Sequence, residues 1–243
     1  MGPYEVHPSN PILTSADDET LVLQKAGHGD LIQTPDDEWY MVHLCARPLE
    51  TRGRCVLGRE TAIQRVEWRD DNWLYLNTRT NHPEWEIGDT THSARDTRGQ
   101  AERDDFNDDE LSMSFQSLRI PIDSGLASLK SRPGYLRLIG KESLSSVHTQ
   151  SLVARRQQAF RFRAETCMEF SPESSQHFAG LIAYYNTENY VYLAVSSNDG
   201  LGTVLRVIHC HRGVPSESTG DGIPIRSPDA FWLRLEVEMA NSQ

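Results

Sequence analysis

The amino-acid sequence predicts an all-β protein, and three features carry that prediction. Short apolar runs are joined by turn residues, as in LIQTPDDEWYMVHL, where a Pro-Asp-Asp turn lies between two runs. The same plan recurs further along the chain in AIQRVEWRDDNWLYL. In a third type of segment, such as FRFRAETCMEF, apolar and polar residues alternate, so that one face of a strand can be buried while the other contacts water.

The two hairpins have related turns. The second repeats turn residues of the first at an offset of 34 residues, with Asp70, Asp71 and Trp73 following Asp36, Asp37 and Trp39. A spacing of this order is typical of successive blades of a β-propeller, in which each blade is a small antiparallel sheet. Two copies are too few to close a ring, and open blade faces and edges need cover. Either further blades or other parts of a protein must supply that cover.

A polar segment follows the hairpins. Residues 77–109 are rich in charged residues and show no apolar period, which is typical of a linker or a long surface loop. We therefore divide the chain into a partial β-propeller at residues 1–87, a linker at 88–104 and a β-sandwich domain at 105–243.

Strands with alternating residues fill the last part of the chain. The segment FAGLIAYYNTENYVYLAVS predicts two strands joined at Asn186 to Asn189, and TVLRVIHCHRG and FWLRLEVEM repeat the alternation. Together these strands predict a sandwich. The segment FWLRLEVEM ends where a hairpin partner is expected, and an unpaired strand edge favours association between chains. We therefore expect homo-oligomers or other association through such edges.

Charge and hydropathy narrow the classes of partner. Acidic residues outnumber basic ones by 35 to 24, and the net charge of -11 weighs against binding to nucleic acid or to an anionic membrane. No apolar run approaches the length of a membrane span, and the opening MGPYEVHPSN lacks the basic and apolar regions of a signal peptide. As written, the chain is expected to stay in the cytoplasm. A full-length parent protein could still be secreted. The expected partner is small or neutral.

A series of segments resembles a known family. In chain order they are GPYEVHPSNPIL, LQKAGHGDL, EWYMVHLCARPL, LGRETAIQRVEW, FQSLRIPI, RPGYLRLIGKESLSSVHTQSLVARRQQ and AGLIAYYNTENYVYLAV. From about residue 2 to about residue 237 the chain resembles the second half of a glycoside hydrolase family 43 β-xylosidase. The resemblance implies the end of a five-bladed β-propeller followed by a concanavalin A-like β-sandwich, or jelly roll, cut at both ends. It also implies inverting hydrolysis of xylo-oligosaccharides or arabinoxylan-derived sugars, of the β-xylosidase or α-L-arabinofuranosidase type.

The resemblance also bears on catalysis. In this family one carboxylate activates water, a carboxyl group protonates the leaving oxygen and a third carboxylate tunes the acid, with acid and base roughly 6.5 to 9.5 Å apart. All three lie upstream of the motif that begins this chain, so no catalytic residue is assigned here. Asp30 and Glu60 are the nearest substitutes, and neither matches a family position. The chain alone is expected to be inactive and to need no cofactor; the alternative function is a non-catalytic accessory or carbohydrate-binding module.

Two residues of the chain match supporting positions of the family site. His28, in AGHGDL, is similar to a histidine that lies under the sugar pocket and in some members holds a divalent cation, often calcium. Glycines on both sides would let the backbone come close to the propeller axis. Arg59, in LGRETAI, resembles an arginine that interacts with substrate hydroxyls, for which a guanidinium fork is well suited. The plainer interpretations are a turn histidine and an arginine paired with Glu60.

Aromatic side chains give a further set of candidates for sugar stacking. They are Trp39, Trp73, Tyr184, Tyr185 and Tyr192. An aromatic ring can bind the apolar side of a pyranose, but aromatic residues at strand spacing more often pack in the core or on a sheet face.

Overall fold

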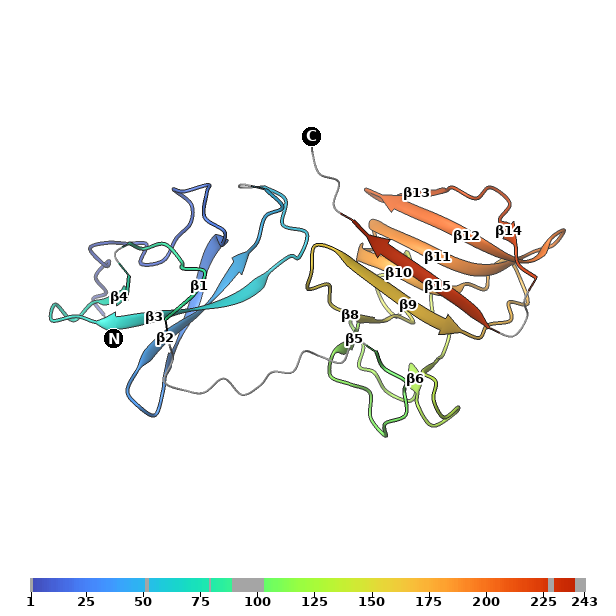
Figure 1. Ribbon diagram of the computed structural model, residues 1–243, viewed down its shortest axis with the longest axis horizontal. Helices are drawn as coiled ribbons and strands as arrows, with labels where there is room; N and C mark the ends of the chain where they lie inside the picture. The colour runs from blue at the N-terminus through green and yellow to red at the C-terminus, as the bar shows by residue number, and fades with distance from the viewer. Residues whose placement is uncertain (1, 51–52, 79, 89–102, 227–229, 239–243) are drawn as a thin grey trace. The chain divides into compact units, whose positions relative to one another are not determined.

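The computed structural model describes residues 2–50, 53–78, 80–88, 103–226 and 230–238 (Figure 1). All regular elements among these residues are β-strands, which confirms the predicted fold class. None of the described residues belongs to a helix long and apolar enough to cross a membrane. The chain forms two compact units, which are described separately: Met1–Thr97 with Gln157–Phe160, and Arg98–Arg156 with Arg161–Gln243. The predicted linker at 88–104 lies largely outside the described residues.

The first unit contains one antiparallel sheet with its strands in chain order. These are β1 (Gln24–Gln33), β2 (Trp39–Ala46), β3 (Glu60–Trp68) and β4 (Leu74–Leu76). The two predicted hairpins, β1–β2 and β3–β4, are joined because β2 pairs with β3 from Trp39↔Val66 to Cys45↔Glu60. The interpretation of the hairpins as two successive blades is therefore wrong. They are the halves of a single four-stranded sheet, the size of one blade.

The two turns superimpose at an offset of 35 residues, one more than the sequence repeat. The Thr34 amide donates to the Glu38 carbonyl at 2.8 Å, and the Arg69 amide donates to the Trp73 carbonyl at 3.0 Å. Trp39 therefore begins β2, whereas Trp73 closes a turn. Because side chains alternate along a strand, a shift of one residue sends the two indoles to different surroundings.

The core of the first unit lies on one face of this sheet. Its buried members are Leu13, Met41, Val66, Leu74 and Leu76. The segment that carries Leu13 is held in place by two hydrogen bonds: the Thr14 amide donates to the Asn81 carbonyl, and the Asn81 side-chain amide donates to the Pro11 carbonyl, both at 2.9 Å.

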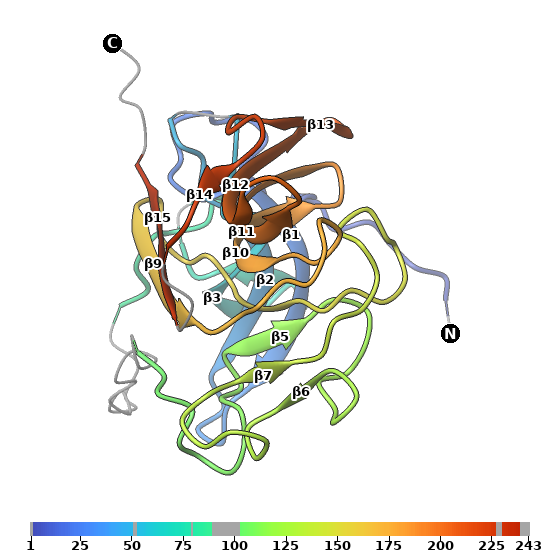
Figure 2. The ribbon, with the colours of Figure 1, turned by 90° about the vertical axis from the view of Figure 1, so that its right-hand side faces the viewer.

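The second unit is built from short strands and two packed layers. The short strands are β5 (Phe115–Ser117), β6 (Ala127–Ser128), β7 (Arg137–Leu138) and β8 (Val153–Arg155). One layer consists of β10 (Ala179–Asn186), β11 (Asn189–Asn198), β12 (Gly202–His211), β13 (Val214–Glu217) and β14 (Ile223–Pro224). The other layer pairs β9 (Phe162–Met168) with β15 (Phe231–Val237). Figure 2 shows these two strands as a layer apart from β10, β11 and β12.

Two clusters of buried residues stabilise this unit on opposite faces of β11. Val195 packs with Phe231 and Leu233 between the two layers, while Tyr190 and Tyr192 belong to the second cluster. The predicted hairpin at Asn186 to Asn189 is confirmed, since β10 ends at the first of these residues and β11 begins at the last. The last strand does have a partner, because β15 pairs with β9 from Phe231↔Met168 to Val237↔Phe162. The two strands form a two-stranded sheet, so β15 is still an edge strand among the described residues.

Candidate functional site

Strand β1 is irregular at the end that carries the candidate histidine. Its register with β2 is Gln24↔Ala46, Gly27↔Leu44 and Asp30↔Val42, with a shift between each successive pair. In each interval two residues of β1 oppose one residue of β2, which defines two successive β-bulges. They are Lys25–Ala26 opposite Cys45 and His28–Gly29 opposite His43.

Each bulge begins with a residue in the left-handed backbone region. Lys25 has φ 56° and His28 has φ 51°, where glycine is normally favoured. Such a conformation in a non-glycine residue costs on the order of 1–3 kcal/mol, and residues of this kind cluster at ligand sites. The bulge also leaves the His28 side chain exposed. His28 therefore combines a left-handed backbone conformation with an exposed imidazole.

The two glycines that flank His28 have different roles. Gly27 has φ 157°, a backbone conformation that residues with a side chain rarely adopt. Gly29 is required by packing, because a Cβ atom there would lie 2.7 Å from Cγ and Sδ of the buried Met41. We expected the two glycines to supply the unusual backbone conformation around His28. The structure shows that His28 itself also adopts a left-handed conformation.

His43 is a second histidine in this region that the sequence interpretation missed. It is 2% exposed and lies in β2 opposite the bulge of His28. Its Nδ1 lies 2.9 Å from the Leu44 carbonyl oxygen, and its Nε2 is buried without a hydrogen-bond partner. The sequence pattern could have predicted that His43 is buried. Met41, His43 and Cys45 are alternate residues of one strand, so they share its buried face.

The same end of the sheet holds a bidentate ion pair between Arg47 and Glu60. Arg47 Nε donates to Glu60 Oε1 and Oε2 at 3.1 and 3.0 Å, and Nη2 donates to Oε1 at 2.7 Å. These hydrogen bonds raise the pKa of Arg47 above its ordinary value. Burial, followed by the Glu60 charge, raises the pKa of the adjacent Cys45 thiol. The Arg47 guanidinium also lies over the rings of Trp85 and Phe160, with 6.0 and 5.4 Å to their centroids.

The structure places His28 and Arg59 near the same end of the sheet. Leu44 of β2 is the partner of both Gly27 and Thr61, so His28 and the exposed Arg59 lie within a few residues of one row across the sheet. Strands two positions apart are separated by roughly 10 Å.

The two carboxylates of this region do not form an acid–base pair. Arg47 Nε donates to both carboxylate oxygens of Glu60. Asp30 is exposed, and its Oδ1 accepts a hydrogen bond from the Leu31 amide at 2.9 Å. Glu60 is thus engaged in an ion pair and Asp30 lies in solvent, and no catalytic role is assigned to either group.

A metal ion at His28 finds no support in the surrounding donors. Among the residues that the structure describes, no three His, Cys, Asp or Glu side chains lie close enough together to hold one. The described residues therefore do not fit a cation at His28 by themselves, and no step below uses one.

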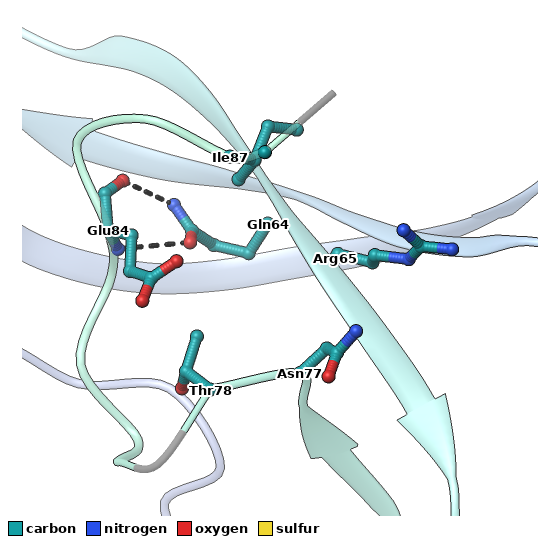
Figure 3. A pocket seen from close by; sticks show the side chains of 7 residues that line it. Gln64, Arg65, Asn77, Thr78, Glu84 and Ile87 are labelled. Carbon is teal, nitrogen blue, oxygen red and sulfur yellow. Dashed lines mark hydrogen bonds between the residues drawn. The ribbon is translucent and has the colours of Figure 1, made fainter. Parts of the chain in front are cut away.

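A small cavity of about 280 Å³ lies beside β3 in the first unit (Figure 3). It is lined by Gln64, Arg65, Asn77, Thr78, Glu84, Ile87 and Gly88. The Gln64 amide, 1% exposed, donates to the Glu84 carbonyl at 2.9 Å and accepts from the Glu84 amide at 3.0 Å. Figure 3 shows this pair of bonds tying the loop to the strand, so Gln64 serves the fold. Neither His28 nor Arg59 lines this cavity.

The aromatic candidates mostly serve packing. Trp39 packs against the core of the first unit, and Trp73 contacts the ring of His7 edge-on at 5.1 Å between centroids. Tyr184 and Tyr192 belong to a hydrophobic cluster of the second unit. Of the five candidates only Tyr185, at 74%, is largely exposed.

Comparison with known proteins decides the ancestry of this chain. The model for the β-xylosidase C-terminal concanavalin A-like domain matches residues 103–243, and the model for glycosyl hydrolases family 43 matches residues 1–74. The chain belongs to glycoside hydrolase family 43. Among solved structures, the family 43 chain is similar to xylan β-1,4-xylosidase from Bacillus halodurans C-125, with TM-score 0.91 and 46% identity over 97% of this chain and 45% of that one.

Curated relatives of this family 43 chain are similar at the level of sequence. The β-xylosidase of Bacillus subtilis (strain 168) is 44% identical over 98% of the chain, and the putative β-xylosidase of Escherichia coli (strain K12) is 43% identical over 98%. In both cases the match covers 46% of the relative. The chain thus spans somewhat under half the length of the curated relatives it matches.

Proposed function

We propose that the protein serves the hydrolysis of xylan-derived sugars by a family 43 enzyme, and that His28 and Arg59 bind the sugar. The observation that carries the proposal is the strained bulge, in which His28 takes a left-handed backbone conformation and leaves its imidazole exposed. Family membership supplies the substrate class, since relatives are named β-xylosidase, xylosidase/arabinosidase and non-reducing end α-L-arabinofuranosidase.

The chemistry of the two residues suits a neutral polyol. A guanidinium such as that of Arg59 offers five donors in a fixed fork and stays charged at all working pH values, so it can bond two hydroxyl oxygens at once. An imidazole in its neutral form offers one donor and one acceptor, which matches a hydroxyl group that both donates and accepts.

We further propose that the chain by itself binds sugar without hydrolysing it. Inverting hydrolysis needs a general acid and a general base about 6.5 to 9.5 Å apart. Glu60 is held by Arg47, and Asp30 is solvated, so the two carboxylates nearest the site are unsuited to these roles. The described residues position the sugar, and the carboxyl chemistry belongs to a longer catalytic assembly.

The experiment is a pair of measurements on the purified chain. Hydrolysis of 4-nitrophenyl β-xyloside and 4-nitrophenyl α-L-arabinofuranoside is expected to stay at the buffer rate. Titration calorimetry with xylotriose is expected to show binding that weakens about tenfold in His28→Ala and in Arg59→Ala, the loss of roughly one charge-assisted or well-placed hydrogen bond. Turnover that disappears in both variants would contradict the proposed inactivity and would assign the chemistry to Asp30 or Glu60. Xylotriose binding that is unchanged in both variants would contradict the assigned site.

A second candidate function is an accessory carbohydrate-binding module. One observation favours it: the second unit exposes a tryptophan, Trp232, at 73% on a sheet face. Such a module would bind the same class of sugar without taking part in the reaction.

A further inference from the structure

The outer face of the layer formed by β9 and β15 has a distinctive composition. Along β15, Phe231 and Leu233 are buried against the other layer, so the alternating residues Trp232, Arg234 and Glu236 point outward. The outward neighbours on β9 follow from the register, and the pairs are Trp232↔Cys167, Arg234↔Glu165 and Glu236↔Arg163. We call these six residues the Trp232 face.

Trp232 lies at one end of this face with its ring in solvent. It is 73% exposed, whereas its neighbours along the strand, Phe231 and Leu233, are 6% and 5% exposed. Its cross-strand partner is Cys167, a small side chain that leaves most of the indole uncovered. A tryptophan exposed to this extent does little for the core of the unit, so its large apolar ring is available to a ligand.

The charged members of the face are organised into ion pairs. Arg234 Nε donates to Glu165 Oε1 at 2.5 Å, and Arg234 Nη1 lies 3.6 Å from Glu236 Oε1. With Arg163 opposite Glu236, the face carries two positive and two negative side chains and so has no net charge. The ion pair holds the Arg234 guanidinium next to the indole, and its remaining donors still face solvent because the side chain is 57% exposed.

The face is hollowed rather than flat. A shallow cavity of about 530 Å³ is lined by Glu165, Trp232, Leu233 and Arg234. It therefore brings together a ring for stacking, a guanidinium donor and a carboxylate acceptor. Ligand sites of this kind combine one large apolar surface with a few polar groups that fix orientation.

We propose that the Trp232 face is a second sugar-binding site that takes a linear xylo-oligosaccharide. The absence of net charge disfavours an anionic polymer or a lipid headgroup. A pyranose ring presents an apolar side to the indole and hydroxyl groups to Arg234 and Glu165. The identity of the sugar rests on the proposed function, whereas the site belongs to the second unit and His28 and Arg59 belong to the first.

The test uses the full chain with His28→Ala and Arg59→Ala both present, so that sugar bound at the first site does not contribute. Titration calorimetry with xylohexaose is expected to show retained binding in this background. Adding Trp232→Ala is expected to weaken it about tenfold or more, and Trp232→Phe should restore part of the affinity because a smaller ring remains. Phe178→Ala is the matched control, since Phe178 is an aromatic residue that is 41% exposed in the same unit and lies outside the Trp232 face. Its affinity should equal that of the background.

The possible outcomes distinguish failure of the site at Trp232 from failure of the site at His28 and Arg59. If the His28→Ala and Arg59→Ala background loses all xylohexaose binding, the Trp232 face is not a sugar site, and the proposed function stands. If binding persists in the background but is unchanged by Trp232→Ala, the proposed site is wrong. A dimer that dissociates in Trp232→Ala, seen by analytical ultracentrifugation without any loss of xylohexaose affinity, would assign the face to a second copy of the chain and would overturn the proposal.

Discussion

The ten-residue strands β1 and β11 are both paired in an antiparallel sheet, but they differ in regularity and in burial. From Tyr190↔Cys210 to Asn198↔Gly202, β11 pairs with β12 without a break, and its residues Ala194 and Val195 are fully buried. Strand β1 shifts register twice within six residues, and most of its side chains are exposed. The regular pair builds a core, while the irregular pair presents side chains. The difference implies that substitutions in the first pair change mainly stability, and substitutions in the second change mainly binding.

The largest expected effect tests β11 along its other edge, where it pairs with β10. Gly180 of β10 pairs with Ala194, and a Cβ atom built on it would overlap the Leu193 carbonyl oxygen of β11. Backbone cannot move aside cheaply, so Gly180→Ala should lower the free energy of unfolding by about 3 kcal/mol or more. Urea unfolding monitored by circular dichroism measures this change. A loss below about 1 kcal/mol would show that the pair tolerates distortion and would weaken the contrast with β1.

A smaller effect is expected where β1 contacts the core. In Gly29→Ala the new methyl group meets Cγ and Sδ of Met41, which is a flexible side chain. We expect a loss of about 1–2 kcal/mol in the free energy of unfolding. The double variant with Met41→Ala should lose less than the sum of the two single variants, because the shorter side chain makes room. Strict additivity in urea unfolding would show that the two positions do not contact each other.

The smallest effect concerns alkaline pH. Burial raises the pKa of Tyr192, 7% exposed, above its ordinary value of 10.0. The unfolded chain then ionises first as the pH rises, so the stability due to the neutral buried phenol is intact below about pH 10 and falls above it. The fall is at most about 1.4 kcal/mol per pH unit.

Comparison of two proteins isolates this contribution. The free energy of unfolding of the parent chain and of Tyr192→Phe should run in parallel up to about pH 9.5 and diverge above it, with the variant losing less. Curves that stay parallel up to pH 11 would indicate that Tyr192 is not buried in solution.

The sequence is sufficient for the regular parts of this molecule. Alternation and turn residues predict both hairpins of the first unit and the turn at Asn186 to Asn189, because these patterns report burial on one face of a strand. They do not predict how hairpins join. The turns of the first unit match at 35 residues and the aspartates at 34, so the repeat of Trp39 at Trp73 is a coincidence of composition.

Such sequence patterns predict the candidate site less well than they predict the strands. Glycine is the usual residue in a left-handed conformation, so AGHGDL directs attention to the two glycines, whereas the conformation falls on His28. A bulge depends on which residues the neighbouring strand offers, and that pairing is not visible in β1 alone. The same holds for the Arg47–Glu60 pair, which joins the residue that follows β2 to the first residue of β3. In the sequence, the arginine next to Glu60 is Arg59.

The central claim is that the left-handed conformation of His28 serves sugar binding, and Lys25 supplies the matched control. Lys25 begins the preceding bulge with nearly the same φ and is also exposed. The decisive measurement is xylotriose titration of Lys25→Gly and His28→Gly, with the free energy of unfolding measured for both. Both glycines fit the backbone, so the two stabilities should agree within about 0.5 kcal/mol, while only His28→Gly loses affinity, by about tenfold. Equal affinities for the two variants would contradict the claim.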